Sequence, residues 1–92
     1  MAVTILIPAP LRRFTNEQAS VQVEAGTVGE ALTKLDAQFP GIRDRLCEPD
    51  GRLRRFVSVF VNGRDVRSLE GLDTPLREGD EVGIIPAMAG GR

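Results

Sequence analysis

The chain has 92 residues, of which 41% are hydrophobic and 27% are charged, and its formal net charge is −1. This length provides one domain with one hydrophobic core, and the composition is that of a globular chain, not of a disordered or membrane protein. The near-neutral charge predicts no nucleic-acid or membrane partner, and the absence of histidine argues against a hydrolase triad or a zinc site.

Two strands are predicted in the N-terminal quarter. Val3–Ile7 is β-branched and apolar, and Pro8 ends it. No signal peptide precedes this segment, so a cytoplasmic location is expected. After a polar connection, Ala19–Glu24 alternates apolar and polar residues, which is the pattern of a half-buried strand. The two strands are expected to form a hairpin.

A helix is predicted next, and it begins with a capping box. Thr27 can cap the first turn, and Glu30 can bond back to it. Pro40 and Gly41 end the helix, and 42–46 can form one more short turn. The residues that share one apolar stripe against the core are Val28, Ala31, Leu32, Leu35 and Phe39.

Two features follow this helix, and each has a structural and a functional interpretation. The single cysteine, Cys47, is expected to be a packing or surface residue, with a redox or metal role as the alternative. The arginines at 52, 54 and 55 form a basic cluster, expected to be a solvated approach to the next strand. Contact with an acidic groove is the alternative.

The strongest strand signal in the chain is Phe56–Val61, and Asn62-Gly63 after it is a tight-turn signal. The three valines of this strand are expected to face the helix. Phe56 and Phe60 would then lie on the other face, where they are either a partner-binding surface or covered by a loop.

The remaining elements complete an α+β two-layer domain. Residues 64–67 are expected to form a short returning strand, 68–75 a loop, and Glu81–Ile85 the last strand. One helix on one sheet leaves the opposite face of the sheet open. The domain is predicted to span 1–86, and 87–92 are predicted to form a flexible tail.

The tail ends almost on Gly-Gly. Because glycine has no Cβ, Gly90 and Gly91 can lie extended in a narrow channel and bring a carboxylate to another protein's reactive centre. Met88 and Ala89 would form the stem that follows them. A frayed terminus without a function is the alternative interpretation.

Together these features resemble the MoaD/ThiS family of ubiquitin-like sulfur carriers, and within it the CysO-type carriers of cysteine biosynthesis. The resemblance covers essentially the whole chain. It implies a β-grasp fold with a mixed four- to five-stranded sheet and one main helix packed on one face. The segments that carry it are Val3-Thr4, Ile7-Pro8, Phe39-Pro40-Gly41-Ile42, Arg45-Leu46, Arg55-Phe56-Val57, Val61-Asn62, Asp65-Val66-Arg67, Gly79–Val82, Ile85-Pro86-Ala87 and Ala89-Gly90-Gly91.

The resemblance implies a protein co-substrate that is not itself an enzyme and holds no bound cofactor. An adenylating enzyme of the ubiquitin-activating type would use ATP to activate the carboxylate of Gly91, and a sulfur donor would convert it to a thiocarboxylate. The acceptor would be a pyridoxal-phosphate cysteine synthase or another sulfur-accepting enzyme, and a metalloprotease would process the tail. Phe56 and Phe60 would be docking surface.

One residue departs from the family pattern, because Arg92 follows the glycines and locks the Gly91 carbonyl in an amide. We expect Arg92 to be removed before activation. Three functions stay open at this point: a sulfur carrier for cysteine, molybdopterin or another pathway; a modifier conjugated through Gly91; and an interaction module with an inert tail.

Overall fold

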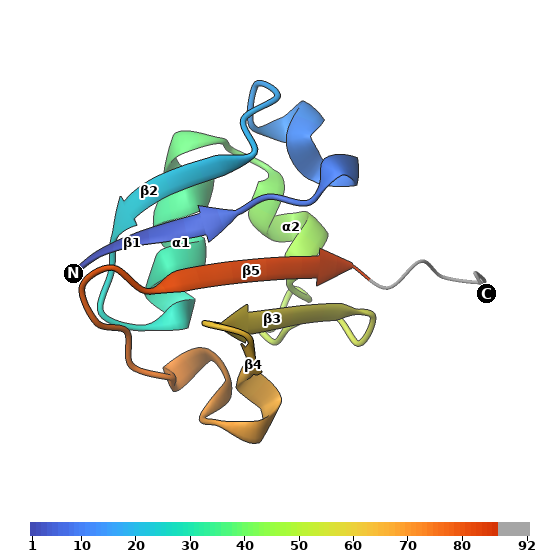
Figure 1. Ribbon diagram of the computed structural model, residues 1–92. Helices are drawn as coiled ribbons and strands as arrows, with labels where there is room; N and C mark the ends of the chain where they lie inside the picture. Colours follow the sequence, from blue (N-terminus) through green and yellow to red (C-terminus); the bar gives the residue numbers. More distant parts are fainter. Residues whose placement is uncertain (87–92) are drawn as a thin grey trace.

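A computed structural model describes residues 1–86 of the chain (Figure 1). It contains one five-stranded sheet, one long helix and one short helix. The elements are β1 (Ala2–Leu6), β2 (Ser20–Glu24), α1 (Val28–Gln38), α2 (Ile42–Leu46), β3 (Val57–Val61), β4 (Arg64–Asp65) and β5 (Glu81–Pro86), with short segments of 3-10 helix at Ala9–Phe14, Val66–Ser68 and Gly71–Asp73.

The strand order in the sheet is β2-β1-β5-β3-β4. The first and last strands, β1 and β5, are parallel neighbours in its middle, and the other pairs are antiparallel. The two helices cover one face, and the other face is open (Figure 1). The predicted mixed sheet with one main helix on one face is confirmed.

The core lies between α1 and the sheet. The helix contributes Val28, Ala31, Leu32 and Leu35, as predicted for its apolar stripe. Phe39, at the end of the helix, is only partly buried. From the sheet it takes one alternating set of apolar side chains. The largest of these with almost no exposed surface are Val3, Ile5, Val57, Val59 and Val82.

The first turn of α1 is capped as predicted, with one difference. The Oγ1 of Thr27 accepts from the backbone N–H of Glu30 at 3.1 Å. The carboxylate of Glu30 does not bond to Thr27 itself; it accepts from the N–H of Gly26 at 2.6 Å, one residue earlier. The reciprocal capping thus satisfies two backbone donors at the start of the helix.

Three local expectations need correction. The predicted hairpin of β1 and β2 is confirmed by their antiparallel pairing, but its connection is not irregular throughout, because it contains the 3-10 segment Ala9–Phe14. Ala19 is exposed and precedes β2. Phe56 lies in a turn before β3, because the N–H of Val57 donates to the carbonyl of Arg54 at 2.9 Å.

Side chains of α1 cover the outer edge of β2. The ammonium group of Lys34 donates to the carbonyl oxygen of Glu24 at 2.9 Å, and the amide of Gln38 donates to that of Gln22 at 3.3 Å. These bonds occupy outward carbonyls that another strand would otherwise use. Within residues 1–86, no helix has the length and apolarity needed to cross a membrane.

Candidate functional site

The central strand β5 leads the chain towards the tail. Its pairing with β3 continues to its last residue, because Pro86 lies opposite Val57. On its other side, β1 pairs with its first half, from Glu81 to Gly83. The point at which the chain leaves the sheet is therefore fixed by strand pairing.

The guanidinium group of Arg67 stabilises the place where the chain leaves the sheet. Nη2 of Arg67 donates to the carbonyl oxygen of Val57 at 2.6 Å, and Nη1 donates to the hydroxyl of Ser58 at 3.2 Å. Asp65 turns the chain so that this contact forms, since its carboxylate accepts from the N–H of Arg67 at 2.8 Å. Arg67 thus fixes the start of β3 beside the end of β5. Residues 64–67 were predicted as one strand, but the strand ends at Asp65, and Arg67 lies in the 3-10 turn Val66–Ser68.

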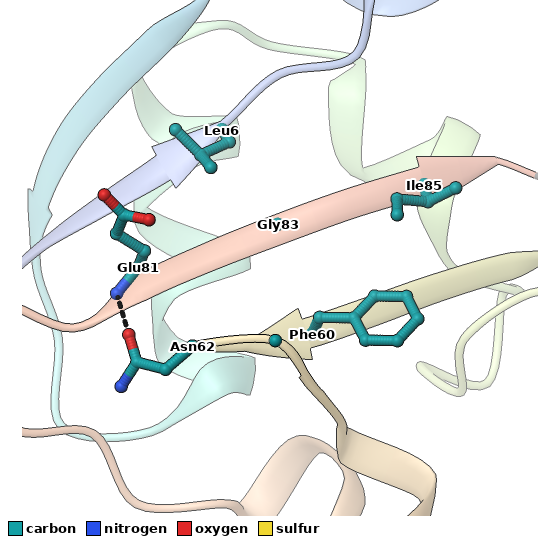
Figure 2. Close-up of a pocket in the computed structure, with 7 residues that line it drawn as sticks. Leu6, Phe60, Asn62, Glu81, Gly83 and Ile85 are labelled. Atoms are coloured by element: carbon teal, nitrogen blue, oxygen red, sulfur yellow. Dashed lines mark hydrogen bonds between the residues drawn. The ribbon is translucent and has the colours of Figure 1, made fainter.

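The open face of the sheet has a shallow hollow of about 380 Å³ next to β5 (Figure 2). Its floor is Gly83, which lies between Leu6 of β1 and Phe60 of β3 in one row of the sheet. Leu6 is 41% exposed, and Ile85, two residues beyond Gly83, is 54% exposed. The surface is therefore an apolar rim around a strand position that has no side chain.

Backbone geometry does not demand a glycine at this position. Its φ is not positive, and a Cβ on Gly83 would come no closer than 4.0 Å to any atom, the carbonyl oxygen of Phe60. The residue neither fills a tight approach nor forms a turn. Because Gly83 has no side chain, the hollow stays open to solvent and to a side chain of a partner.

A polar frame closes one end of the hollow. The side-chain amide of Asn62 accepts from the N–H of Glu81 at 3.0 Å and donates to the carboxylate of Asp80 at 2.9 Å. Two bonds hold the pKa of Asp80 below its usual range: the larger effect is the N–H of Arg77, and the second is the amide of Asn62. Asn62 and Gly63 both have positive φ, which confirms the predicted tight turn.

The two aromatic residues predicted as docking surface lie in different places. Phe60 lines the hollow (Figure 2). Phe56 is 45% exposed in the turn before β3, beside the end of β5, and is not among the residues of the hollow. Their role in partner binding stays a prediction. The predicted tail sites Met88, Ala89, Gly90, Gly91 and Arg92 lie outside the described residues.

Cys47 is a packing residue in this structure. It is 3% exposed, and burial raises the pKa of its thiol, against the smaller opposing effects of Arg43 and Arg54. Between residues 1 and 86, no three His, Cys, Asp or Glu side chains are grouped so that they could hold a metal ion.

Comparison with known proteins identifies the family. The ThiS family profile matches residues 5–91 of the chain. The chain belongs to the ThiS family. The resemblance found in the sequence is thus confirmed. The matched range of this ThiS-family chain ends at Gly91 and leaves out Arg92.

Individual relatives of this ThiS-family chain include two bacterial carriers and an archaeal modifier. Sulfur carrier protein CysO of Mycobacterium tuberculosis is 45% identical over 93 residues, 99% of this chain and all of the relative. Small archaeal modifier protein 3 of Haloferax volcanii is 45% identical over 65 residues, 71% of this chain and 70% of the relative. One chain in the crystal structure of the Amycolatopsis orientalis BexX/CysO complex matches with a TM-score of 0.92 and 40% identity, over 98% of this chain and the whole of that chain, which confirms the β-grasp fold.

Proposed function

We propose that this protein is a sulfur carrier that acts in cysteine biosynthesis, through the carboxylate of Gly91 after Arg92 has been removed. The observation that supports this most is the full-length identity with mycobacterial CysO. The end of the family match at Gly91 supports the removal of Arg92, because the carrier chemistry needs a free glycyl carboxylate.

The chemistry takes place on the tail. The Gly91 carboxylate attacks the α-phosphate of ATP, which gives an acyl-adenylate and releases pyrophosphate. A sulfide from the donor then attacks the carbonyl carbon and displaces AMP, which leaves a thiocarboxylate. ATP is bound by the adenylating enzyme. The carrier supplies a fixed point at Pro86, from which the five residues to Gly91 span at most about 18 Å.

In this function the chain is a co-substrate and not an enzyme, and it works in the cytoplasm. Its partners are the adenylating enzyme, a pyridoxal-phosphate synthase that accepts the sulfur, and a metalloprotease that processes the tail. Gly90 gives clearance in the partner's channel, with Ala89 and Met88 as the stem. The hollow beside Phe60, with Phe56 near the exit, is the docking surface; its exposed apolar rim is the feature that supports this.

The test is an incubation of the chain ending at Gly91 with its adenylating enzyme, ATP and sulfide, followed by mass spectrometry of the intact protein. The enzyme can be obtained by ATP-dependent capture on the immobilised chain. We expect a mass gain that corresponds to one sulfur replacing one oxygen. The chain that retains Arg92 is the matched control and should gain nothing. Absence of the gain in the trimmed chain would refute the carrier function.

A modifier conjugated to target lysines through Gly91 is the second candidate, and the identity with small archaeal modifier protein 3 favours it. It predicts isopeptide adducts of higher mass when the trimmed chain is incubated in lysate with ATP. A molybdopterin synthase carrier subunit is a third, which differs only in the enzyme that accepts the sulfur. Transfer to purified acceptor enzymes of the two pathways separates these carriers.

A further inference from the structure

The net charge of the chain is near zero, but the charge is not spread evenly over the molecule. Arginines gather at the end of the sheet where β1 and β5 stop and the tail begins. Arg12 lies there because its Nε donates to the carbonyl of Ile7, just after β1, at 3.0 Å. Arg55 lies there because it precedes β3, whose first residue pairs with Pro86. The arginines of this basic end are Arg12, Arg13, Arg45, Arg54, Arg55 and Arg67.

Several of these guanidinium groups are held in place. Arg13 and Arg45 both lie over the ring of Phe14, at 5.0 and 4.9 Å from its centre. Arg54 donates from Nε and Nη2 to the carbonyl oxygen of Asp44, at 3.0 and 2.9 Å. Positive charge that is already ordered loses less entropy on binding than charge on free side chains.

Carboxylates at the basic end cancel only part of this charge. Glu48 pairs with Arg54, and Asp50 pairs with Arg52. Within the part of the chain that the structure describes, Arg13, Arg45 and Arg55 have no carboxylate within 4.0 Å.

The opposite end of the sheet carries charges of both signs, because its acidic residues lie near Arg64, Arg77 and the amino terminus. Glu81 starts β5, and Asp80 precedes it. Glu78 lies beside the start of β1, since its carboxylate accepts from the N–H of Ala2 at 2.9 Å. Glu24 ends β2 and pairs with the amino terminus at 3.3 Å. Positive charge is therefore concentrated at the end of the sheet where β5 stops, and the other end is mixed.

We infer that the basic end docks against an acidic rim around the channel of the adenylating enzyme, and that it orients the carrier tail first. This inference rests on the proposed function and adds the chemistry of the partner's surface. Positive charge concentrated at one end turns the carrier in the field of an acidic partner before contact, which raises the association rate without changing the chemistry of the tail. The apolar hollow would then seat the complex once the two proteins are oriented.

The test uses two double variants with the same net charge. Arg13→Glu with Arg55→Glu reverses charge at the basic end. Arg64→Glu with Arg77→Glu reverses it at two exposed positions near the opposite end of the sheet. Arg55→Gln serves as a milder variant should the first fail to fold. Circular dichroism checks folding, and kcat/KM for pyrophosphate release by the adenylating enzyme is measured with each chain trimmed to Gly91.

We expect kcat/KM to fall by about tenfold for the basic-end variant at low salt, and by less than about twofold for its matched control. At about 0.5 M NaCl, the difference should disappear because the charges are screened. Retention on immobilised poly-L-glutamate should follow the same order.

Equal kcat/KM values for the two variants at low salt would overturn the inference. A second outcome would also overturn it: the basic-end variant keeps its kcat/KM but loses the binding of a single-stranded RNA oligonucleotide that the wild-type chain shows. The charge would then serve a nucleic acid. If the wild-type chain is adenylated in the same assay, the carrier function stands even when the inference about the basic end fails.

Discussion

Asn62 and Asp80 join the turn after β3 to the turn before β5. Their side chains bond to each other at 2.9 Å, and each also bonds a backbone N–H, of Glu81 and Arg77 respectively. The frame around the hollow therefore depends on an ionised carboxylate. Because the pKa of Asp80 is lowered in the folded chain, folding is stabilised while this carboxylate is ionised.

Asp80→Asn should lower the free energy of unfolding at pH 7 by about 1 kcal/mol, since the bonds to the carboxylate are partly exposed. The loss should be present above about pH 4 and should shrink as the pH falls through the lowered pKa of Asp80. Urea unfolding of both chains between pH 2 and 7, in steps of about one unit, measures it. A deficit that is equally large at every pH would contradict the role given to the charge.

At the scale of elements, the hollow on the open face exists because β5 has no side chain at Gly83. Gly83→Ala should raise the free energy of unfolding by about 0.5 kcal/mol, because alanine restricts the unfolded chain and its Cβ fits without a clash. Gly83→Leu should fold and fill the hollow, and we expect it to weaken partner binding at least about tenfold. Calorimetry against the captured adenylating enzyme compares them. Equal affinity of the leucine and alanine variants would show that the hollow does not take part in docking.

The start of β3 depends on Arg67. Arg67→Leu removes a charged donor from the carbonyl of Val57, and we expect a loss of about 2 kcal/mol in the free energy of unfolding. Hydrogen exchange should become faster at residues 57–58 and 84–85, and remain unchanged in β2. Arg67→Lys, which keeps a donor, is the control and should lose less. A uniform change over the whole sheet would contradict a local role.

Elements with a local cause were predictable from the sequence. The tight turn at Asn62-Gly63 and the cap at Thr27 each depend on residues a few positions apart, and the stripe of α1 depends on its period. The hollow and the clamp by Arg67 depend on strand register: Gly83 lies between Leu6 and Phe60 only once three strands are aligned. The placement of Phe56 was wrong because a turn interrupts the alternation from which its face was predicted.

At the scale of the whole molecule, the sequence divided the chain into a domain of 1–86 and a tail of 87–92. The core cluster lies within the first of these segments. We expect a chain that ends at Pro86 to have the same melting temperature as one that ends at Gly91, within about 2 °C. Calorimetry of the two chains measures this. A lower melting temperature for the shorter chain would show that the tail packs on the domain, which would contradict a tail free to enter another protein.

The bonds from Lys34 and Gln38 to the β2 edge also protect the carrier from aggregation. In the proposed cycle each carrier is loaded and unloaded repeatedly, so it must stay unaggregated between partners. Crowded copies of a sheet with an unprotected border would stack into fibrils. Here the long helix shields one border, and the other is a strand of only two residues, Arg64–Asp65. Lys34 is also the single lysine of the chain, so an isopeptide-linked chain of carriers would have one lysine per copy on which to grow.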